Sequence, residues 1–153
     1  AFLRDELFVE IIADGKHLPV DLVKMIIKIK GTDKTALITD SLEIACTDIK
    51  EGVMGGTEFI VEDGVCKLSD RSALAGSIAT MDRLIRTMVH QAEIPLFDAL
   101  RMISETPAKI MKVYDRKGSL EKGKDADMIV LDKDLNLCGV MSMGNVVEGT
   151  WTV

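Results

Sequence analysis

Residues 8–40 read FVEIIADGKHLPVDLVKMIIKIKGTDKTALITD, and this stretch decides the fold class. The nearly continuous β-rich apolar run 8–13 predicts a strand that is buried on both faces. A helix is predicted next, because Pro19 suits a first helical position, apolar residues follow at helical spacing, and Gly31 closes the segment. The apolar run 35–39 predicts a second strand. Strand, helix and strand at this spacing form a βαβ unit, so we expect parallel neighbouring strands and an α/β fold.

Both predicted strands end in an acid, Asp14 and Asp40. In parallel α/β folds, the groups that act on ligands sit at the carboxyl ends of the strands. Propensity leaves two interpretations of Asp40 open. Its carboxylate can bond the backbone N–H groups of a local turn, or it can orient a metal-bound water, accept its proton and later return it.

Two further segments have both a functional and an ordinary interpretation. In ADGKH, His17 lies close to a helix N-terminus and can contact a polar or anionic ligand, whereas Asp14 and Gly15 can simply form a turn. In LAGS, residues Leu74 to Ser77, small residues allow the backbone to approach a ligand closely. Ser77 and the N–H groups that follow can bind an oxyanion or a sugar hydroxyl, or Ser77 can be the ordinary cap of a helix predicted over residues 78–92.

The remaining elements extend this pattern to the end of the chain. Asp63-Gly64, between the β-rich runs 57–61 and 65–68, predicts a β-hairpin inserted near residues 57–68. Pro95 opens another predicted helix, and Thr106-Pro107 predicts the N-cap and first position of a short one. Strands are expected after Gly118, at residues 126–131, 137–141 and 146–153. Because the pattern changes from helix to strand near Val113, we place a domain boundary between residues 112 and 113.

Composition excludes several classes of partner. The net charge of −6 and the pI near 4.9, without a block of Lys and Arg, argue against nucleic acid. No apolar run reaches the length of a membrane span. The three cysteines lie far apart, a spacing that favours neither a disulfide framework nor a thiolate zinc site. This use of cysteine indicates a reducing, cytoplasmic compartment. The first residue is not Met, so we expect the sequence to be a piece of a larger protein.

Taken in order, the motifs IIADGKHLP, ALITDS, LAGSIATM, TPAKIM and GSLEKGKDADMIVLD resemble the C-terminal part of the N-acetylglucosamine-6-phosphate deacetylases, in the amidohydrolase superfamily. The resemblance spans essentially the whole chain. It implies an α/β fold in which residues 1–112 are the C-terminal part of a metal-dependent-hydrolase (β/α)8 TIM-like barrel. Residues 113–153 would then be the C-terminal strands of a small β-sandwich.

The same resemblance implies a site and a reaction. Enzymes of this family remove acetate from N-acetylglucosamine 6-phosphate by means of a metal-activated water. Asp40 corresponds to the general base and acid, His17 to a substrate-contacting histidine, and Leu74, Ala75, Gly76 and Ser77 to the loop that lines the sugar phosphate pocket. The family's metal ligands lie on strands upstream of this chain. We therefore expect the divalent metal, zinc or iron, only in the full-length enzyme, and the chain alone to be inactive.

The residues themselves agree with that expectation about the metal. Only two histidines exist, His17 and His90, and neither a His-x-His nor a His-Glu-x-x-His spacing is present. No obvious pair of arginines accompanies the motifs, so we expect part of the phosphate site to come from elsewhere. An open partial barrel exposes strand edges and apolar helix faces, so we expect the chain either to pair with another copy, as a homo-oligomer (dimer), or to be partly loosened in solution.

Two rival functions stay open at this point. The first is another amidohydrolase, such as a cyclic amidase or a deaminase, which can share the GKDAD strand and a strand-end Asp. The second is a noncatalytic module that binds a sugar phosphate in the same pocket without metal. Acetate release from N-acetylglucosamine 6-phosphate separates the first rival, and ligand titration with metal analysis separates the second.

Overall fold

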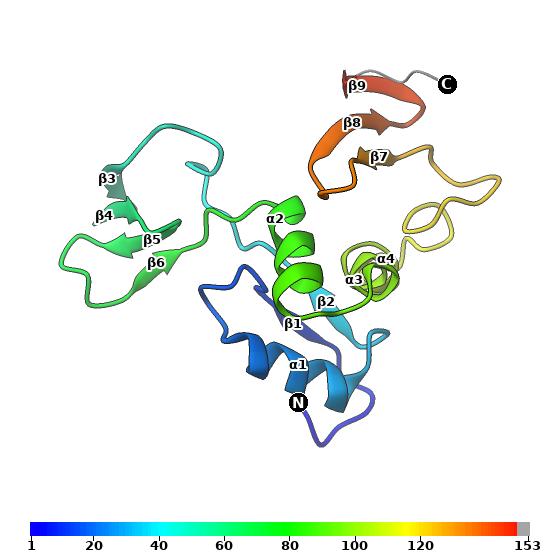
Figure 1. Cartoon of the computed structure of the whole chain (residues 1–153), viewed down its shortest axis with the longest axis horizontal. Helices are drawn as coiled ribbons and strands as arrows, with labels where there is room; N and C mark the ends of the chain where they lie inside the picture. The colour runs from blue at the N-terminus through cyan, green and yellow to red at the C-terminus, as the bar shows by residue number, and fades with distance from the viewer. Residues whose placement is uncertain (150–153) are drawn as a thin grey trace.

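The computed structural model describes residues 1–149 (Figure 1). Strand β1 (Val9–Ile11) and strand β2 (Thr35–Leu37) pair in parallel, and helix α1 (Val20–Lys30) connects them. Helix α1 ends as predicted, because Gly31 adopts a φ of +74° and its N–H donates to the carbonyl of Ile27. The βαβ unit is therefore confirmed, although both strands are shorter than the apolar runs that predicted them.

One face of this small sheet carries the main core. Ile11 and Leu37 point to that face and join Val23 of α1 and Leu84 of a later helix in one apolar cluster. Leu37 and Leu84 are fully buried, which stabilises the fold by roughly 1.5–3 kcal/mol for each side chain. Glu10 lies on the opposite face by strand alternation and is exposed. Its partner Ala36 on that opposite face is nevertheless buried, so the cluster with α1 and the later helix defines the face of Ile11 and Leu37.

A second sheet lies to one side of these helices (Figure 1). Its four antiparallel strands pair in chain order, β3 (Glu51–Met54), β4 (Thr57–Glu62), β5 (Val65–Leu68) and β6 (Leu74–Gly76). The predicted hairpin is confirmed, and Asp63 and Gly64 both adopt the positive φ that a two-residue turn requires. The two outer strands were not predicted, because β6 is short and the glycines beside β3 weaken its strand pattern.

The long helix predicted over residues 78–92 is wrong in its start and in its regularity. Helix α2 (Met81–Arg86) begins three residues later and continues as a π-helical turn, η1 (Thr87–Gln91). Ser77 is not its cap, because Thr80 occupies the N-cap position of α2, and the Ser77 hydroxyl accepts the N–H of Ala79 at 2.9 Å in the segment before the helix. The backbone of Ser77 is still extended and forms a parallel bridge, and this pairing is what displaces the helix start.

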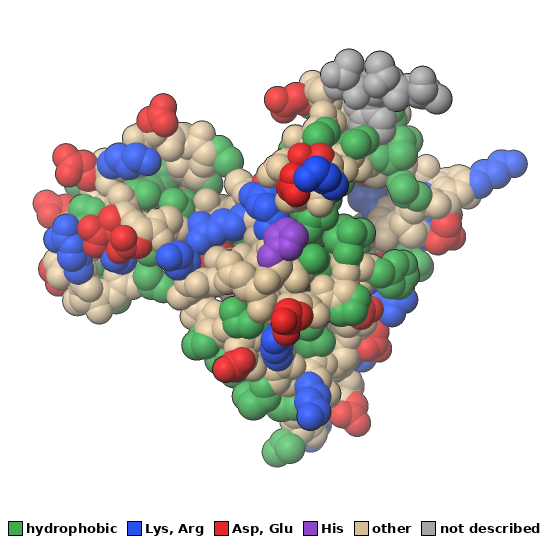
Figure 2. Space-filling model, in the orientation of Figure 1, with side chains coloured by type: hydrophobic (Ala, Val, Ile, Leu, Met, Phe, Trp, Pro, Cys, Tyr) green, Lys and Arg blue, Asp and Glu red, His purple; other side chains and the backbone are tan. Residues whose placement is uncertain are grey.

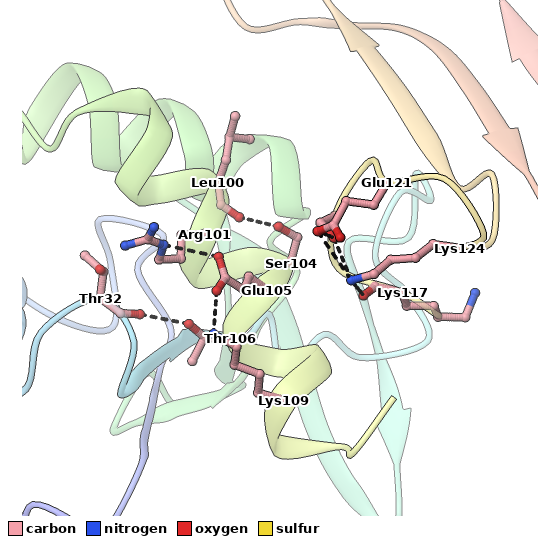
Figure 3. Close-up of polar contacts among 11 residues, drawn as sticks. Thr32, Leu100, Arg101, Ser104, Glu105, Thr106, Lys109, Lys117, Glu121 and Lys124 are labelled. Carbon is pink, nitrogen blue, oxygen red and sulfur yellow. Dashed lines mark hydrogen bonds and ion pairs between the residues drawn. The ribbon is translucent and has the colours of Figure 1, made fainter. Parts of the chain in front are cut away.

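The two predicted helices that follow are both present, and the second begins differently. Helix α3 (Leu96–Ile103) follows Pro95 as expected, and helix α4 (Glu105–Ile110) starts before Thr106. Figure 3 shows why Thr106 is not the N-cap: its hydroxyl donates to the carbonyl of Thr32 at 2.8 Å. A capping prediction considers only local partners, and here a partner 74 residues away satisfies the hydroxyl.

The chain finishes with a three-stranded antiparallel sheet that pairs in the order β7 (Met128–Leu131), β8 (Leu137–Ser142) and β9 (Asn145–Gly149). These strands match the predicted ones closely, and the predicted continuation over 150–153 lies outside the described residues. The domain boundary between residues 112 and 113 stays a prediction. No helix within residues 1–149 is long and apolar enough to cross a membrane.

Candidate functional site

The two strand-end acids lie at one edge of the β1–β2 sheet. Ile11 stands opposite Leu37 in the parallel register, and the N–H of Ile38 donates to the carbonyl of Ile11 at 3.0 Å. Asp14 and Asp40 each follow these partners by three residues. The register therefore brings them to the same level at the carboxyl ends of the two strands, where parallel sheets present ligand-binding groups.

A third segment joins this edge beside Asp40. Ser41 pairs in parallel with Ser77, and the N–H of Leu42 donates to the carbonyl of Ser77 at 2.9 Å. The Ser41 hydroxyl also donates to the carbonyl of Ala79. The structure thus brings together the three segments that the sequence singled out, although they are far apart in the chain.

The Asp14 carboxylate organises the ADGKH loop. Its Oδ1 accepts the backbone N–H groups of Lys16 and His17, both at 2.9 Å, and its Oδ2 lies 3.0 Å from Nδ1 of His17. The Asp14 side chain is 1% exposed and that of His17 is 15% exposed. Both interpretations of this motif are therefore present in one arrangement: Asp14 makes a turn, and the turn fixes the imidazole of His17.

The ionisation of Asp14 determines which nitrogen His17 offers to a ligand. Burial alone would raise the pKa of Asp14, but the N–H groups of His17 and Lys16 and the imidazole favour the charged form, and the net pKa is lowered. An ionised carboxylate only accepts hydrogen bonds, so Nδ1 of His17 must be the donor. This leaves Nε2 of His17 as the atom available for an outside group.

The Asp40 side chain is accessible and, among the described residues, lacks the partners that hold the Asp14 carboxylate. It is exposed, and within residues 1–149 its carboxylate takes part in no assigned hydrogen bond or ion pair. Its backbone has a φ of +48°, in the left-handed region that Asp adopts more readily than most residues. A carboxylate that is accessible and free of partners can accept a proton from a bound molecule and return it.

The LAGS segment supplies backbone and small side chains. Leu74 is exposed, whereas Ser77 is fully buried. Gly76 has a φ of +125°, and a Cβ at this position would lie 2.8 Å from the side chain of Leu42, so the close approach needs glycine. The Ser77 hydroxyl already accepts the N–H of Ala79, and Ser77 is buried. The accessible surface of this segment therefore belongs to its first three residues.

Sequence reasoning missed a polar cavity of about 340 Å³ beside the ADGKH loop. Its basic members are Lys16, Arg83, Arg86 and His90, and Arg83 contacts Asp14 directly. The fold thus places two arginines of α2 next to the loop, although no obvious arginine pair accompanies the motifs. No sequence signal points to them, because 69 residues separate Arg83 from Asp14.

The described part of the chain does not assemble a metal site. Among residues 1–149, no group of three or more His, Cys, Asp or Glu side chains lies close enough to hold a metal ion. Asp40 and His17 alone do not provide the three protein ligands that a catalytic zinc site typically uses. The donor set within the described residues therefore does not fit a resident metal.

Comparison with known proteins identifies the class to which this fold and site belong. Residues 4–147 match the model of the amidohydrolase family, and the chain is a member of that family. It is 35% identical over 148 residues to the N-acetylglucosamine-6-phosphate deacetylase of Bacillus subtilis, covering 95% of this chain and 37% of that protein.

Two solved structures are similar over nearly the whole chain. The N-acetylglucosamine-6-phosphate deacetylase of Pasteurella multocida matches with a TM-score of 0.89 and 33% identity, over 95% of this chain and 38% of that one. A mutant of the Mycobacterium smegmatis deacetylase, in complex with N-acetyl-D-glucosamine-6-phosphate, matches with a TM-score of 0.86 and 29% identity, over 95% and 39%. The chain is thus a mixed α/β segment that spans about two-fifths of the length of these relatives.

Proposed function

We propose that the chain is part of an amidohydrolase that deacetylates N-acetylglucosamine 6-phosphate to glucosamine 6-phosphate and acetate. The observation that carries this proposal is the meeting of three segments at one sheet edge: the loop that orients His17, the accessible Asp40, and Leu74 to Gly76. Deacetylases of this specificity are among the relatives that the chain resembles in sequence and in structure.

In this proposal residues 1–112 are the C-terminal part of the (β/α)8 barrel, and residues 113–153 belong to the small β-sandwich. The parallel β1–β2 pair and the helices on one of its faces support the first assignment, because barrel strands are parallel and are covered on their outer face. The antiparallel β7–β9 sheet supports the second assignment.

The proposed chemistry assigns a separate task to each segment. Asp40 takes a proton from the attacking water as oxygen bonds to the acetyl carbon, then delivers that proton to the sugar nitrogen as the C–N bond breaks. Nε2 of His17 binds the substrate, held in place through Nδ1 by Asp14. Leu74, Ala75 and Gly76 form the wall against the sugar phosphate, and the buried Ser77 holds this wall in place through its pairing with Ser41. The divalent metal proposed for the complete enzyme, zinc or iron, would be held by residues outside this chain.

The test is Asp40→Asn in the complete protein, assayed by acetate release from N-acetylglucosamine 6-phosphate. Loss of a general acid and base is expected to lower turnover by roughly 10²- to 10⁴-fold while substrate affinity changes little. Asp134→Asn is the matched control, because within residues 1–149 the Asp134 carboxylate pairs only with the exposed amine of Lys133. Turnover within a factor of about three of wild type in the Asp40 variant would remove Asp40 from the mechanism.

The same assay separates the first rival, and ligand titration with metal analysis separates the second. Another amidohydrolase, such as a cyclic amidase or a deaminase, would release no acetate from this substrate but would hydrolyse a different amide or amine. A noncatalytic module would bind the sugar phosphate equally well with and without added metal and would leave it unchanged. Each result would replace the proposed activity with the corresponding alternative.

A further inference from the structure

Arg83 of α2 contacts two segments that carry parts of the candidate site. Its Nη2 donates to the carbonyl of Asp14 at 3.2 Å and lies 3.8 Å from Oδ2 of the same residue. Its Nη1 donates to the carbonyl of Gly64, in the β4–β5 turn, at 2.8 Å. The Arg83 side chain is three-quarters buried and Asp14 is buried, so water competes only weakly at the Asp14 contact, whereas the Gly64 carbonyl is exposed.

The Gly64 contact leads to the LAG segment through the four-stranded sheet. Gly64 forms the turn before β5, and β5 pairs with β6, where Cys66 lies opposite Gly76. The Asp14 contact leads to His17, because the Asp14 carboxylate holds both its N–H and its imidazole. Arg83 is therefore a direct link between the His17 loop and the sheet that carries Leu74 to Gly76.

The helix beneath Arg83 also supports the loop by close packing. A Cβ at Gly15 would lie 3.4 Å from the side chain of Thr87 and 3.1 Å from that of Gln91. Both residues belong to the π-helical turn η1, a type of distortion that is frequent at functional sites. Figure 2 shows basic side chains gathered where the four-stranded sheet meets the α2 region.

We propose that Arg83 is a positioning residue, which fixes the Asp14–His17 loop against the sheet that carries Leu74, Ala75 and Gly76. A guanidinium suits this role, because its planar fork can donate to two carbonyls in different directions while its charge faces the Asp14 carboxylate. The consequence for ligand binding rests on the proposed function, whereas the effect on the orientation of His17 does not.

The direct readout is the tautomer of His17, measured from the ¹⁵N shifts of its imidazole in this chain. Only one other histidine is present, so His17→Gln assigns the signals. Wild type is expected to hold the tautomer protonated at Nδ1, which the ionised Asp14 requires. In Arg83→Ala the ratio of this tautomer to the other one should fall about tenfold, the change that corresponds to about 1.4 kcal/mol.

Arg86→Ala is the matched control, because Arg86 lies one turn further along the same helix and lines the same cavity. Its guanidinium binds Asp82 and the carbonyl of Leu135 instead, so the His17 tautomer should not change. If Arg83→Ala does not fold, Arg83→Gln replaces it, since the Gln amide keeps donors but removes the charge. An unchanged tautomer ratio in a folded Arg83 variant, or an equal change in Arg86→Ala, would overturn the proposal.

A kinetic readout in the complete protein extends the test to the ligand. Arg83→Ala should raise KM for N-acetylglucosamine 6-phosphate about tenfold and change kcat by less than about twofold, because positioning affects binding more than proton transfer. A selective fall in kcat would contradict a positioning role. If wild type does not hydrolyse this substrate, the proposed function fails, and the tautomer measurement still decides the role of Arg83.

Discussion

Removing the Asp14 carboxylate should destabilise the chain by an amount that the hydrogen bonds of the loop determine. Asp14 is buried and accepts three hydrogen bonds, two from backbone N–H groups and one from the His17 imidazole. Hydrogen bonds to a charged partner contribute about 1.5–3 kcal/mol each when buried. Lys16 is exposed and His17 is partly so, which reduces the total because water replaces some of the lost contacts.

Two substitutions divide this contribution. Asp14→Asn keeps an oxygen for the two N–H groups but removes the charge and presents an amide to Nδ1 of His17, so we expect a loss of about 1.5 kcal/mol. Asp14→Ala removes every acceptor, and we expect a loss of about 3 kcal/mol. Urea unfolding followed by circular dichroism at 25 °C measures both values as changes in the free energy of unfolding.

The stability that Asp14 contributes should fall at low pH. The pKa of Asp14 is lowered in the folded chain, so its carboxylate contributes stability above the unfolded pKa of about 3.9. That contribution is lost as the pH falls through the folded pKa. The gap between wild type and Asp14→Asn should therefore persist from pH 7 to pH 5 and shrink below about pH 4.

If both Asp14 variants unfold within about 0.5 kcal/mol of wild type at pH 7, the carboxylate does not hold the loop. A gap that grows as the pH falls from 7 towards about 4 would show instead that the pKa of Asp14 is raised in the folded chain.

Two further predictions concern the fold. Thr106→Val should lower the free energy of unfolding by about 1 kcal/mol in urea titrations. The substitution removes the hydrogen bond to Thr32 but keeps the shape of a fully buried side chain. An unchanged free energy of unfolding would mean that the bond contributes nothing. The chain should also form a homodimer in static light scattering. The short β1–β2 sheet has open edges, and apolar side chains such as Phe97 and Met111 are exposed. A sharply melting, strictly monomeric species would contradict this prediction.

The βαβ unit was predictable from sequence because its signals are local. Pro19 and Gly31 bound α1, the apolar spacing gives its buried face, and the strand runs lie on either side. The convergence of Asp14 and Asp40 followed from this unit, since parallel strands end at one edge. The approach of Ser77 to Ser41 did not follow, because a bridge between residues 36 positions apart leaves no local pattern.

The errors have a shared physical cause, which is a contact with a distant segment. The backbone of Ser77 pairs with that of Ser41, which delays the start of α2, and the hydroxyl of Thr106 donates to the carbonyl of Thr32. Arg83 was missed for the same reason, since helical spacing says nothing about a carbonyl on another segment. The turn given as one interpretation of Asp14 and Gly15 is present, and the contact of Asp14 with His17 depends on the loop geometry that this turn creates.

Acetate release by the complete protein tests the central claim most directly. N-acetylglucosamine 6-phosphate should be hydrolysed with a kcat/KM at least about 100-fold higher than that of unphosphorylated N-acetylglucosamine, because the site binds the phosphate in the transition state. This ratio corresponds to about 2.7 kcal/mol. No acetate from the phosphorylated sugar, or equal rates for the two sugars, would contradict the assignment of this chain to an amino-sugar phosphate deacetylase.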